Sequence, residues 1–137
     1  MPEESTDNSG SAFRVLIIDD SRATRLVIRT FMREFGFQTE EAPDGAEAMK
    51  ILSANKTFGL IVCDWEMPVM SGIEFVRHYR GSNCPRSQET PILMSTSVNA
   101  TERIAEALTA GATDYIMKPF TKDIFSSKLD VLGIEHS

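Results

Sequence analysis

Carboxylates stand at the ends of two short apolar runs in this sequence of 137 residues. Asp19 and Asp20 follow the run that ends at Ile18, and Asp64 follows the run 60–63. Such runs are typical of strands buried on both faces, and α/β proteins bind ligands where parallel strands end. Carboxylates gathered at one edge repel one another unless a cation neutralises them. The pattern therefore predicts a divalent metal site.

Two further polar side chains follow later apolar runs. Thr96 stands in a hydroxyl cluster after the run 91–95, and Lys118 follows the run 115–117. Oxygen ligands without His or Cys suit Mg²⁺, which takes one or two carboxylates, several waters and a phosphate oxygen. A Lys charge and a Thr hydroxyl add groups that bind phosphoryl oxygens. Together these residue types indicate phosphoryl transfer onto a carboxylate.

An alternation of strands and helices is needed to bring these residues to one edge. We expect strands at 13–18, 37–42, 60–63, 91–95 and 115–117, each followed by a helix. The first, fourth and last helices should bury apolar residues at helical spacing: Ala23, Leu26, Val27, Thr30, Phe31 and Phe35; Ile104, Ala107 and Leu108; Ile124, Phe125, Leu129 and Leu132. Right-handed crossovers then predict an α/β fold, a doubly wound parallel sheet with helices on both faces.

Composition limits the classes of partner. Apolar and charged contents of 42% and 25% are ordinary for a globular protein, and no apolar run approaches the ~18 residues of a membrane helix. The net charge of −6 argues against binding to nucleic acid or a membrane surface. Cys63 and Cys84 show no metal-binding spacing and suit a reduced, cytoplasmic setting. We expect a disordered leader at 1–12, one domain at 13–133 and a tail at 134–137.

The strand-end residues resemble those of the receiver domains of two-component response regulators. The likeness runs from about Phe13 to Leu132 and is carried by Asp19-Asp20, Asp64 within Asp-Trp-Glu-Met-Pro, Thr96, and Lys118-Pro119. Within that family, the chain closely resembles the single-domain, CheY-like chemotaxis regulators. The resemblance implies a flavodoxin-like sheet of five strands in the order 2-1-3-4-5, with five helices.

The resemblance also implies a phosphorylation switch that assists its own phosphorylation and dephosphorylation instead of turning over a substrate. Asp64 would accept a phosphoryl group from a sensor histidine kinase or a small phosphodonor. Asp20, Asp64 and the backbone carbonyl of Glu66 would bind Mg²⁺ directly, with Asp19 acting mostly through water.

Three residues would turn that chemistry into a binding signal. By the same likeness, Lys118 pairs with the phosphoryl oxygens through a cis Lys118-Pro119 bond, and Thr96 hydrogen-bonds the phosphoryl group. Movement of Thr96 would let Tyr115 turn inward, so the face made by the fourth helix, strand five and the last helix would change shape. A downstream target protein would bind there.

Several alternatives remain open. The same site would serve a phosphorelay shuttle or a phosphate sink, and the chain could be a receiver fragment of a longer regulator. A Mg²⁺-dependent phosphatase with an aspartate nucleophile fits less well, because such enzymes usually show Asp-x-Asp where this chain has Asp64-Trp65-Glu66. Glu66 and Val98 stand where the family tunes the lifetime of the phosphoryl group, so we assume no motor-type lifetime. The segment 81–90 resembles a solvated insertion, or else a partner contact.

Overall fold

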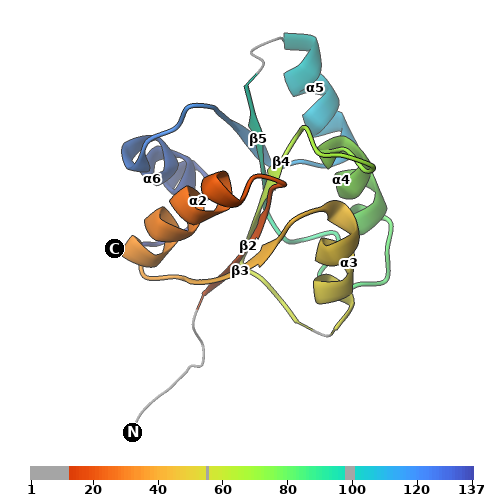
Figure 1. Cartoon of the computed structure of the whole chain (residues 1–137), viewed down its shortest axis with the longest axis horizontal. Coiled ribbons are helices and arrows are strands. Elements are labelled where there is room, and N and C mark those ends of the chain that lie inside the picture. Colours follow the sequence, from red (N-terminus) through yellow and green to blue (C-terminus); the bar gives the residue numbers. More distant parts are fainter. Residues whose placement is uncertain (1–12, 55, 98–100) are drawn as a thin grey trace, which may run out of the picture.

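The computed structural model describes residues 13–54, 56–97 and 101–137. Its strands form one parallel sheet (Figure 1) and are β2 (Arg14–Ile18), β3 (Gln38–Ala42), β4 (Leu60–Asp64), β5 (Ile92–Thr96) and β6 (Asp114–Met117). They lie side by side in the order β3-β2-β4-β5-β6. Counted along the chain this is the order 2-1-3-4-5, so the predicted fold is confirmed.

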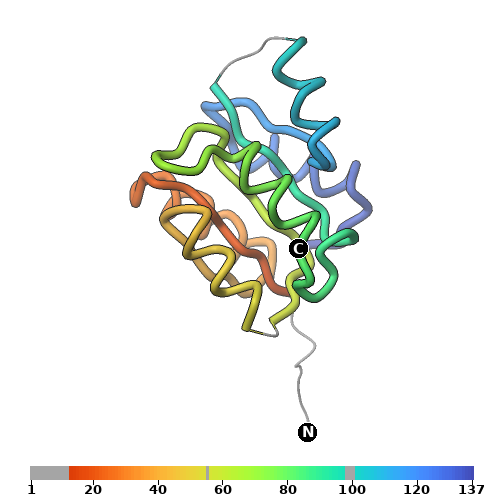
Figure 2. Tube along the Cα trace, turned by 90° about the vertical axis from the view of Figure 1, so that its right-hand side faces the viewer, coloured from red at the N-terminus to blue at the C-terminus, as the bar shows by residue number. Residues whose placement is uncertain are grey.

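Helices cover both faces of the sheet. They are α2 (Arg22–Glu34), α3 (Gly45–Ser53), α4 (Gly72–Arg80), α5 (Thr101–Ala110) and α6 (Lys122–Val131). In Figure 1, α2 and α6 lie on one side of the strands and α3, α4 and α5 on the other. Figure 2 shows that second group side by side. The result is a three-layer α/β/α arrangement.

The central strand β4 contributes side chains to both hydrophobic cores. All five of its residues are buried. Ile61 and Cys63 point into the core beneath α3, α4 and α5, whereas Leu60 and Val62 point into the core beneath α2 and α6. This alternation follows from the two-residue period of a strand, and it explains why the sequence of β4 reads as a continuous apolar run.

Helices α2 and α4 begin at capping residues. Ser21 accepts a hydrogen bond from the Thr24 amide and caps α2. Ser71 and Glu74 form a capping box at the start of α4. Gly72 is required at that start, because a Cβ there would collide with the backbone carbonyl of Asp64. The start of α4 is thus packed directly against the end of β4.

The buried faces of three helices agree only in part with the predicted ones: Phe35, Ala107, Phe125 and Leu129 are buried as expected, and others are not. In α2 the sheet side is Ile28, Met32 and Phe35, whereas Leu26 and Val27 are 50% and 44% exposed. Large exposed side chains also include Leu108 of α5 and Ile124 of α6. These expectations were wrong because the helices carry apolar residues around more than one side, and helical spacing alone does not identify the side that meets the sheet.

The segment 81–90 is solvated only in part, because half of its residues are exposed and the rest pack against the domain. Ser87 and Thr90 are buried. The hydroxyl of Tyr79, which is itself fully buried, donates to Thr90 Oγ1 at 3.0 Å. Arg80 donates from Nε to the carbonyl of Gly111 at 3.0 Å and from Nη1 to the carbonyl of Ser87 at 3.1 Å. The segment is therefore attached at several points between α4 and β5.

The described C-terminal residues also pack on the domain. Ile134 is buried in the core with α2 and α6, and the amide of Ser137 donates to the carbonyl of Phe35 at 2.9 Å. The predicted leader and Val98 lie outside the described residues. Among the described helices, none is long and apolar enough to cross a membrane.

Candidate functional site

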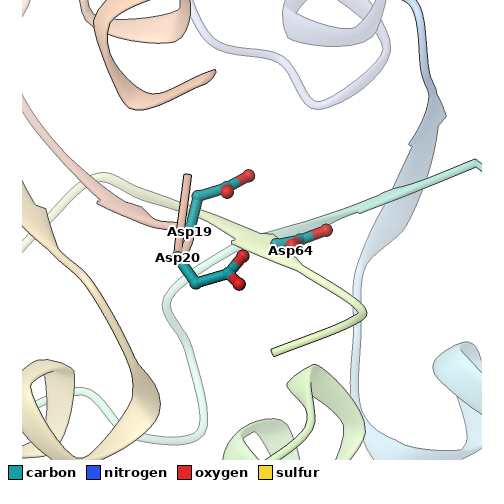
Figure 3. Close-up of side chains that lie close together, drawn as sticks. All are labelled: Asp19, Asp20 and Asp64. Carbon is teal, nitrogen blue, oxygen red and sulfur yellow. The ribbon is translucent and has the colours of Figure 1, made fainter. Parts of the chain in front are cut away.

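Three carboxylates meet at the carboxyl edge of the sheet, as predicted (Figure 3). Asp19 and Asp20 directly follow β2, and Asp64 is the last residue of β4. Because Ile18 pairs with Cys63 in the sheet, the two strands end side by side. One oxygen of each carboxylate lies within 4.8 Å of the others. Asp19 and Asp64 are buried, whereas Asp20 is exposed to solvent.

Backbone and side-chain contacts fix Asp19 in place. Its amide donates to the carbonyl of Ala42 at 3.1 Å, and its Oδ1 accepts from the amide of Ser21 at 2.8 Å. Arg25 donates from Nη1 to the carbonyl of Asp19 at 2.6 Å and from Nε to Glu41 at 3.1 Å. Helix α2 and strand β3 thus hold the loop that carries two of the three carboxylates.

Lys118 supplies the positive charge of the site. Its Nζ donates to Asp64 Oδ1 at 2.9 Å and lies 3.6 Å from Asp19 Oδ2. Lys118 comes directly after β6, and its amide donates to the carbonyl of Thr96 at 2.8 Å. The Lys118-Pro119 bond is cis, as the resemblance implies. Thr96 is buried at the end of β5, so the predicted cation and hydroxyl residue occupy adjacent strand ends.

Burial makes the charged forms of the two inner carboxylates less favourable. It raises the pKa of Asp64 above the ordinary 3.8, although the hydrogen bond from Lys118 works in the other direction. Burial likewise raises the pKa of Asp19. Burial alone would lower the pKa of Lys118, but its hydrogen bond with Asp64 and the charge of Asp19 leave that pKa raised. One cation therefore only partly neutralises the acidic groups.

The acidic cluster fits a hard divalent cation such as Mg²⁺. Asp19 Oδ2 is buried and, among the described atoms, has no hydrogen-bond partner, so it has a free acceptor position facing Lys118. Three carboxylates against one ammonium leave net negative charge, and an all-oxygen donor set suits Mg²⁺. Asp20, being exposed, leaves the cluster open to an ion from solvent.

The loop after Asp64 is fixed at both ends, and one of its contacts was not predicted. The amide of Trp65 donates to the carbonyl of Ser95 at 2.8 Å, and the amide of Gly72 donates to the carbonyl of Trp65 at 2.8 Å. The side chain of Glu66 pairs with Arg103 of α5 at 3.0 Å. No sequence signal joins residues 37 positions apart. The contact of Arg25 with Asp19 spans only six positions, and it was missed because it depends on how α2 docks against the end of β2.

Tyr115 lies in β6, outside the carboxylate cluster. It is partly buried and packs against the core beneath α3, α4 and α5. Lys128 of α6 holds its Nζ 4.4 Å from the centroid of the Tyr115 ring and pairs with Asp114 at 3.2 Å. Tyr115 therefore lies in β6, the strand that Lys118 of the site directly follows.

Comparison with known proteins agrees with this geometry. Residues 15–130 match the model of the response regulator receiver domain. The chain is 36% identical over 120 residues to the chemotaxis protein CheY1 of Helicobacter pylori, covering 87% of this chain and 95% of that protein. It is 36% identical over 118 residues to the chemotaxis protein CheY of Pseudomonas aeruginosa, covering 85% and 93%.

Solved structures give the same result. The chemotaxis protein CheY4 of Vibrio cholerae superposes with a TM-score of 0.81 at 33% sequence identity, covering 88% of this chain and 98% of that one. The order of the strands and the acidic strand ends had already indicated this fold. The chain therefore belongs to the response regulator receiver domain family of two-component signalling and is a CheY-like receiver.

Proposed function

We propose that Asp64 is the phosphoacceptor of a Mg²⁺-dependent signalling switch within a receiver domain that spans residues 13–133. The observation that carries this proposal is the position of Asp64, a buried carboxylate at the end of β4 that accepts a hydrogen bond from Lys118 beside two more carboxylates. A sensor histidine kinase would supply the phosphoryl group, and the pathway would be of the chemotaxis type that its relatives' names indicate.

The transfer needs a nucleophile, a cation for the oxygens and a leaving group. A carboxylate oxygen of Asp64 bonds to phosphorus while the bond from phosphorus to the donor's imidazole nitrogen breaks, and the bonding electron pair leaves with the imidazole. Lys118, now beside Asp64, pairs with the transferred oxygens. Bound Mg²⁺, held by Asp20, Asp64 and the carbonyl of Glu66 with Asp19 acting through water, would neutralise charge on those oxygens.

The signal would leave the site through β5 and β6. Thr96 and Lys118 are joined through their backbones, and Thr96 would hydrogen-bond the phosphoryl group. Tyr115 stands two positions before the end of β6 and lies under Lys128. A rearrangement at Thr96 would therefore reach the face formed by α5, β6 and α6, where we place the binding site for a target protein. Cytoplasmic location stays a prediction.

The ion pair of the Glu66 side chain argues against the phosphatase alternative. A phosphatase of that class would use the acidic residue two positions after the nucleophile as a general acid. Here the Glu66 carboxylate forms an ion pair with Arg103 at 3.0 Å. A phosphorelay shuttle would use the same site, and return of the phosphoryl group to a histidine-containing domain would distinguish it from a terminal switch.

Trp65 fluorescence tests the proposal, because this tryptophan adjoins Asp64 and is the sole one in the chain. Mg²⁺ should produce a saturable change, and acetyl phosphate or beryllium fluoride a second one. Asp64→Asn should abolish the second change, with Lys50→Gln, a substitution on the exposed surface of α3, as the matched control. An equal second change in Asp64→Asn would overturn the assignment.

A further inference from the structure

Arg103, in the first turn of α5, reaches across to the loop that follows the proposed phosphoacceptor. Its Nη1 lies 3.0 Å from Glu66 Oε2, and its Cζ lies 4.5 Å from the centroid of the Trp65 ring. The guanidinium thus makes an ion pair and a cation–π contact with two consecutive residues. Trp65 is buried, and Arg103 is only 28% exposed.

This contact leads directly to the nucleophile. Glu66 stands two residues after Asp64, and its backbone N–H favours the charged form of the Asp64 carboxyl, lowering its pKa against the effect of burial. On its other side, the amide of Trp65 is bound to the carbonyl of Ser95 in β5. Residues 65–66 are therefore held to β5 by a backbone hydrogen bond and to α5 by the contacts of the Arg103 side chain. A shift of α5 that carries Arg103 with it would move the two residues that directly follow Asp64.

The ion pair also neutralises a charge close to the proposed reaction centre. Without Arg103, the Glu66 carboxylate would stand uncompensated two residues after Asp64, in a site that already gathers three carboxylates. An incoming phosphodonor is itself an anion, and the Glu66 carboxylate, which is 55% exposed, would repel it with an energy that solvent partly screens. Arg103 thus both orients the loop and lowers the repulsion that a donor meets.

We propose that Arg103 is a positioning residue for phosphoryl transfer, which holds Glu66 and Trp65, the two residues that follow Asp64, and so couples the position of α5 to the phosphoacceptor. The inference rests on the proposed function of Asp64. It assigns the coupling to a side chain on α5, in addition to the route through Thr96 and Tyr115.

The chain offers a matched control pair. Arg77 of α4 and Glu106 of α5 also form an ion pair between these parts of the molecule, at 3.8 Å. Both side chains are more than half exposed. Arg77→Gln therefore removes one Arg charge and one contact to α5 without touching the loop after Asp64.

The first experiment measures the rate of phosphoryl incorporation from acetyl phosphate with Mg²⁺. We expect Arg103→Gln to slow it roughly three- to tenfold, the scale of one partly exposed ion pair plus one cation–π contact. Arg103→Lys, which keeps the charge, should recover most of the loss, and Arg77→Gln should match the wild type. Equal rates for Arg103→Gln and Arg77→Gln, with a phosphorylated wild type, would overturn the inference alone. A wild type that takes no phosphoryl group would overturn the proposed function and this inference with it.

The second experiment needs neither Mg²⁺ nor phosphorylation. Removal of the guanidinium from the ring face exposes the indole, so Arg103→Gln should shift the Trp65 emission to longer wavelength and increase its quenching by acrylamide. Arg77→Gln should leave both unchanged. An Arg103→Gln spectrum and quenching identical to the wild type would show that the contact does not hold Trp65 and would refute the inference.

Discussion

The carboxyl edge of the sheet and the segment 79–90 bury polar groups in opposite ways. At the carboxyl edge, Asp19 Oδ2 and Ser95 Oγ are buried and, among the described atoms, lack a hydrogen-bond partner. At the amino edge, where residues 79–90 connect α4 to β5, the buried hydroxyls of Tyr79, Ser87 and Thr90 all donate hydrogen bonds. The hydroxyls of the segment 79–90 are satisfied, whereas these two atoms of the carboxyl edge are not. Elsewhere, Thr39 Oγ1 near the start of β3 is also buried without a partner among the described atoms.

The unpaired polar groups lower the stability of the fold at the carboxyl edge. Buried polar groups cost free energy unless they are paired, and the raised pKa values of Asp19 and Asp64, caused by burial, express that cost. Such sites are typical of ligand-binding regions, because the bound group supplies the missing contacts. The carboxyl edge therefore should respond to Mg²⁺ and pH, and the amino edge to neither.

Lys118→Ala should give the largest effect, at the carboxyl edge. It leaves Asp19 and Asp64 buried beside each other without their cation. We expect a loss of about 2 kcal/mol in the free energy of unfolding without Mg²⁺, below the cost of breaking a fully buried pair because Lys118 is partly exposed. Urea unfolding measures this. Saturating Mg²⁺ should recover part of the loss, and a loss that Mg²⁺ leaves unchanged would contradict the comparison.

Tyr79→Phe should give the next effect, at the amino edge. It deletes the hydroxyl that donates to Thr90 while keeping the ring stacked on Phe75. The expected loss is about 1 kcal/mol, the value of one buried hydrogen bond. Because the contact involves no ionised group, the loss in urea unfolding should be the same with and without Mg²⁺. Phosphoryl incorporation should be unchanged, and a slower rate would show that the two edges are not independent.

Asp64→Asn should stabilise the protein without Mg²⁺, by on the order of 1 kcal/mol at about pH 7. Because the pKa of Asp64 is raised by burial, the folded state holds a proton more strongly than the unfolded chain does. The contribution of the Asp64 carboxyl to the stability of the wild type is therefore lost as pH rises from the ordinary pKa of 3.8 through the raised pKa of the folded state.

The advantage of Asp64→Asn should therefore disappear below about pH 4. With Mg²⁺ its sign should reverse, since the wild type gains about 2.7 kcal/mol at a hundredfold excess over Kd and the variant loses a ligand. Thermal unfolding in chelator and in Mg²⁺ checks both statements. An Asp64→Asn variant less stable than the wild type in chelator would contradict the account of the pKa.

Val69→Asn should give the smallest effect. Val69 lies in the loop between β4 and α4 with a φ of 70°, a left-handed backbone that a β-branched side chain adopts at a cost. Its side chain is fully exposed, so the substitution removes no packing, and Asn tolerates this conformation. We expect a gain of about 0.5–1 kcal/mol in urea unfolding. No gain would show that this part of the carboxyl edge is not strained.

The sequence was most informative about β4 and the strand ends. A short apolar run that ends in Asp64 has few other structural solutions, and Asp19, Asp64 and Lys118 meet because parallel strands end at one edge. The buried side of α2 was mispredicted, since Leu26 and Val27 fit a helical period as well as Ile28 does. Local patterns describe a helix but not the direction in which it docks.

Contacts between distant residues could not be predicted at all. Arg103 meets Glu66 only because the first turn of α5 lies beside the loop that follows β4. The segment 81–90 is attached through Tyr79 and Arg80, whose sequence looks like any amphipathic helix end. Both depend on how elements pack, which single-sequence periodicity does not contain.

The most direct test of the central claim locates the phosphoryl group itself. The protein is incubated with acetyl phosphate and Mg²⁺, and the aspartyl phosphate is reduced with borohydride, which marks the modified residue for peptide mass spectrometry. The account predicts one modified residue, Asp64, with no modification in chelator or in Asp64→Asn. Modification at Asp19 or Asp20, or an unchanged yield in Asp64→Asn, would contradict it.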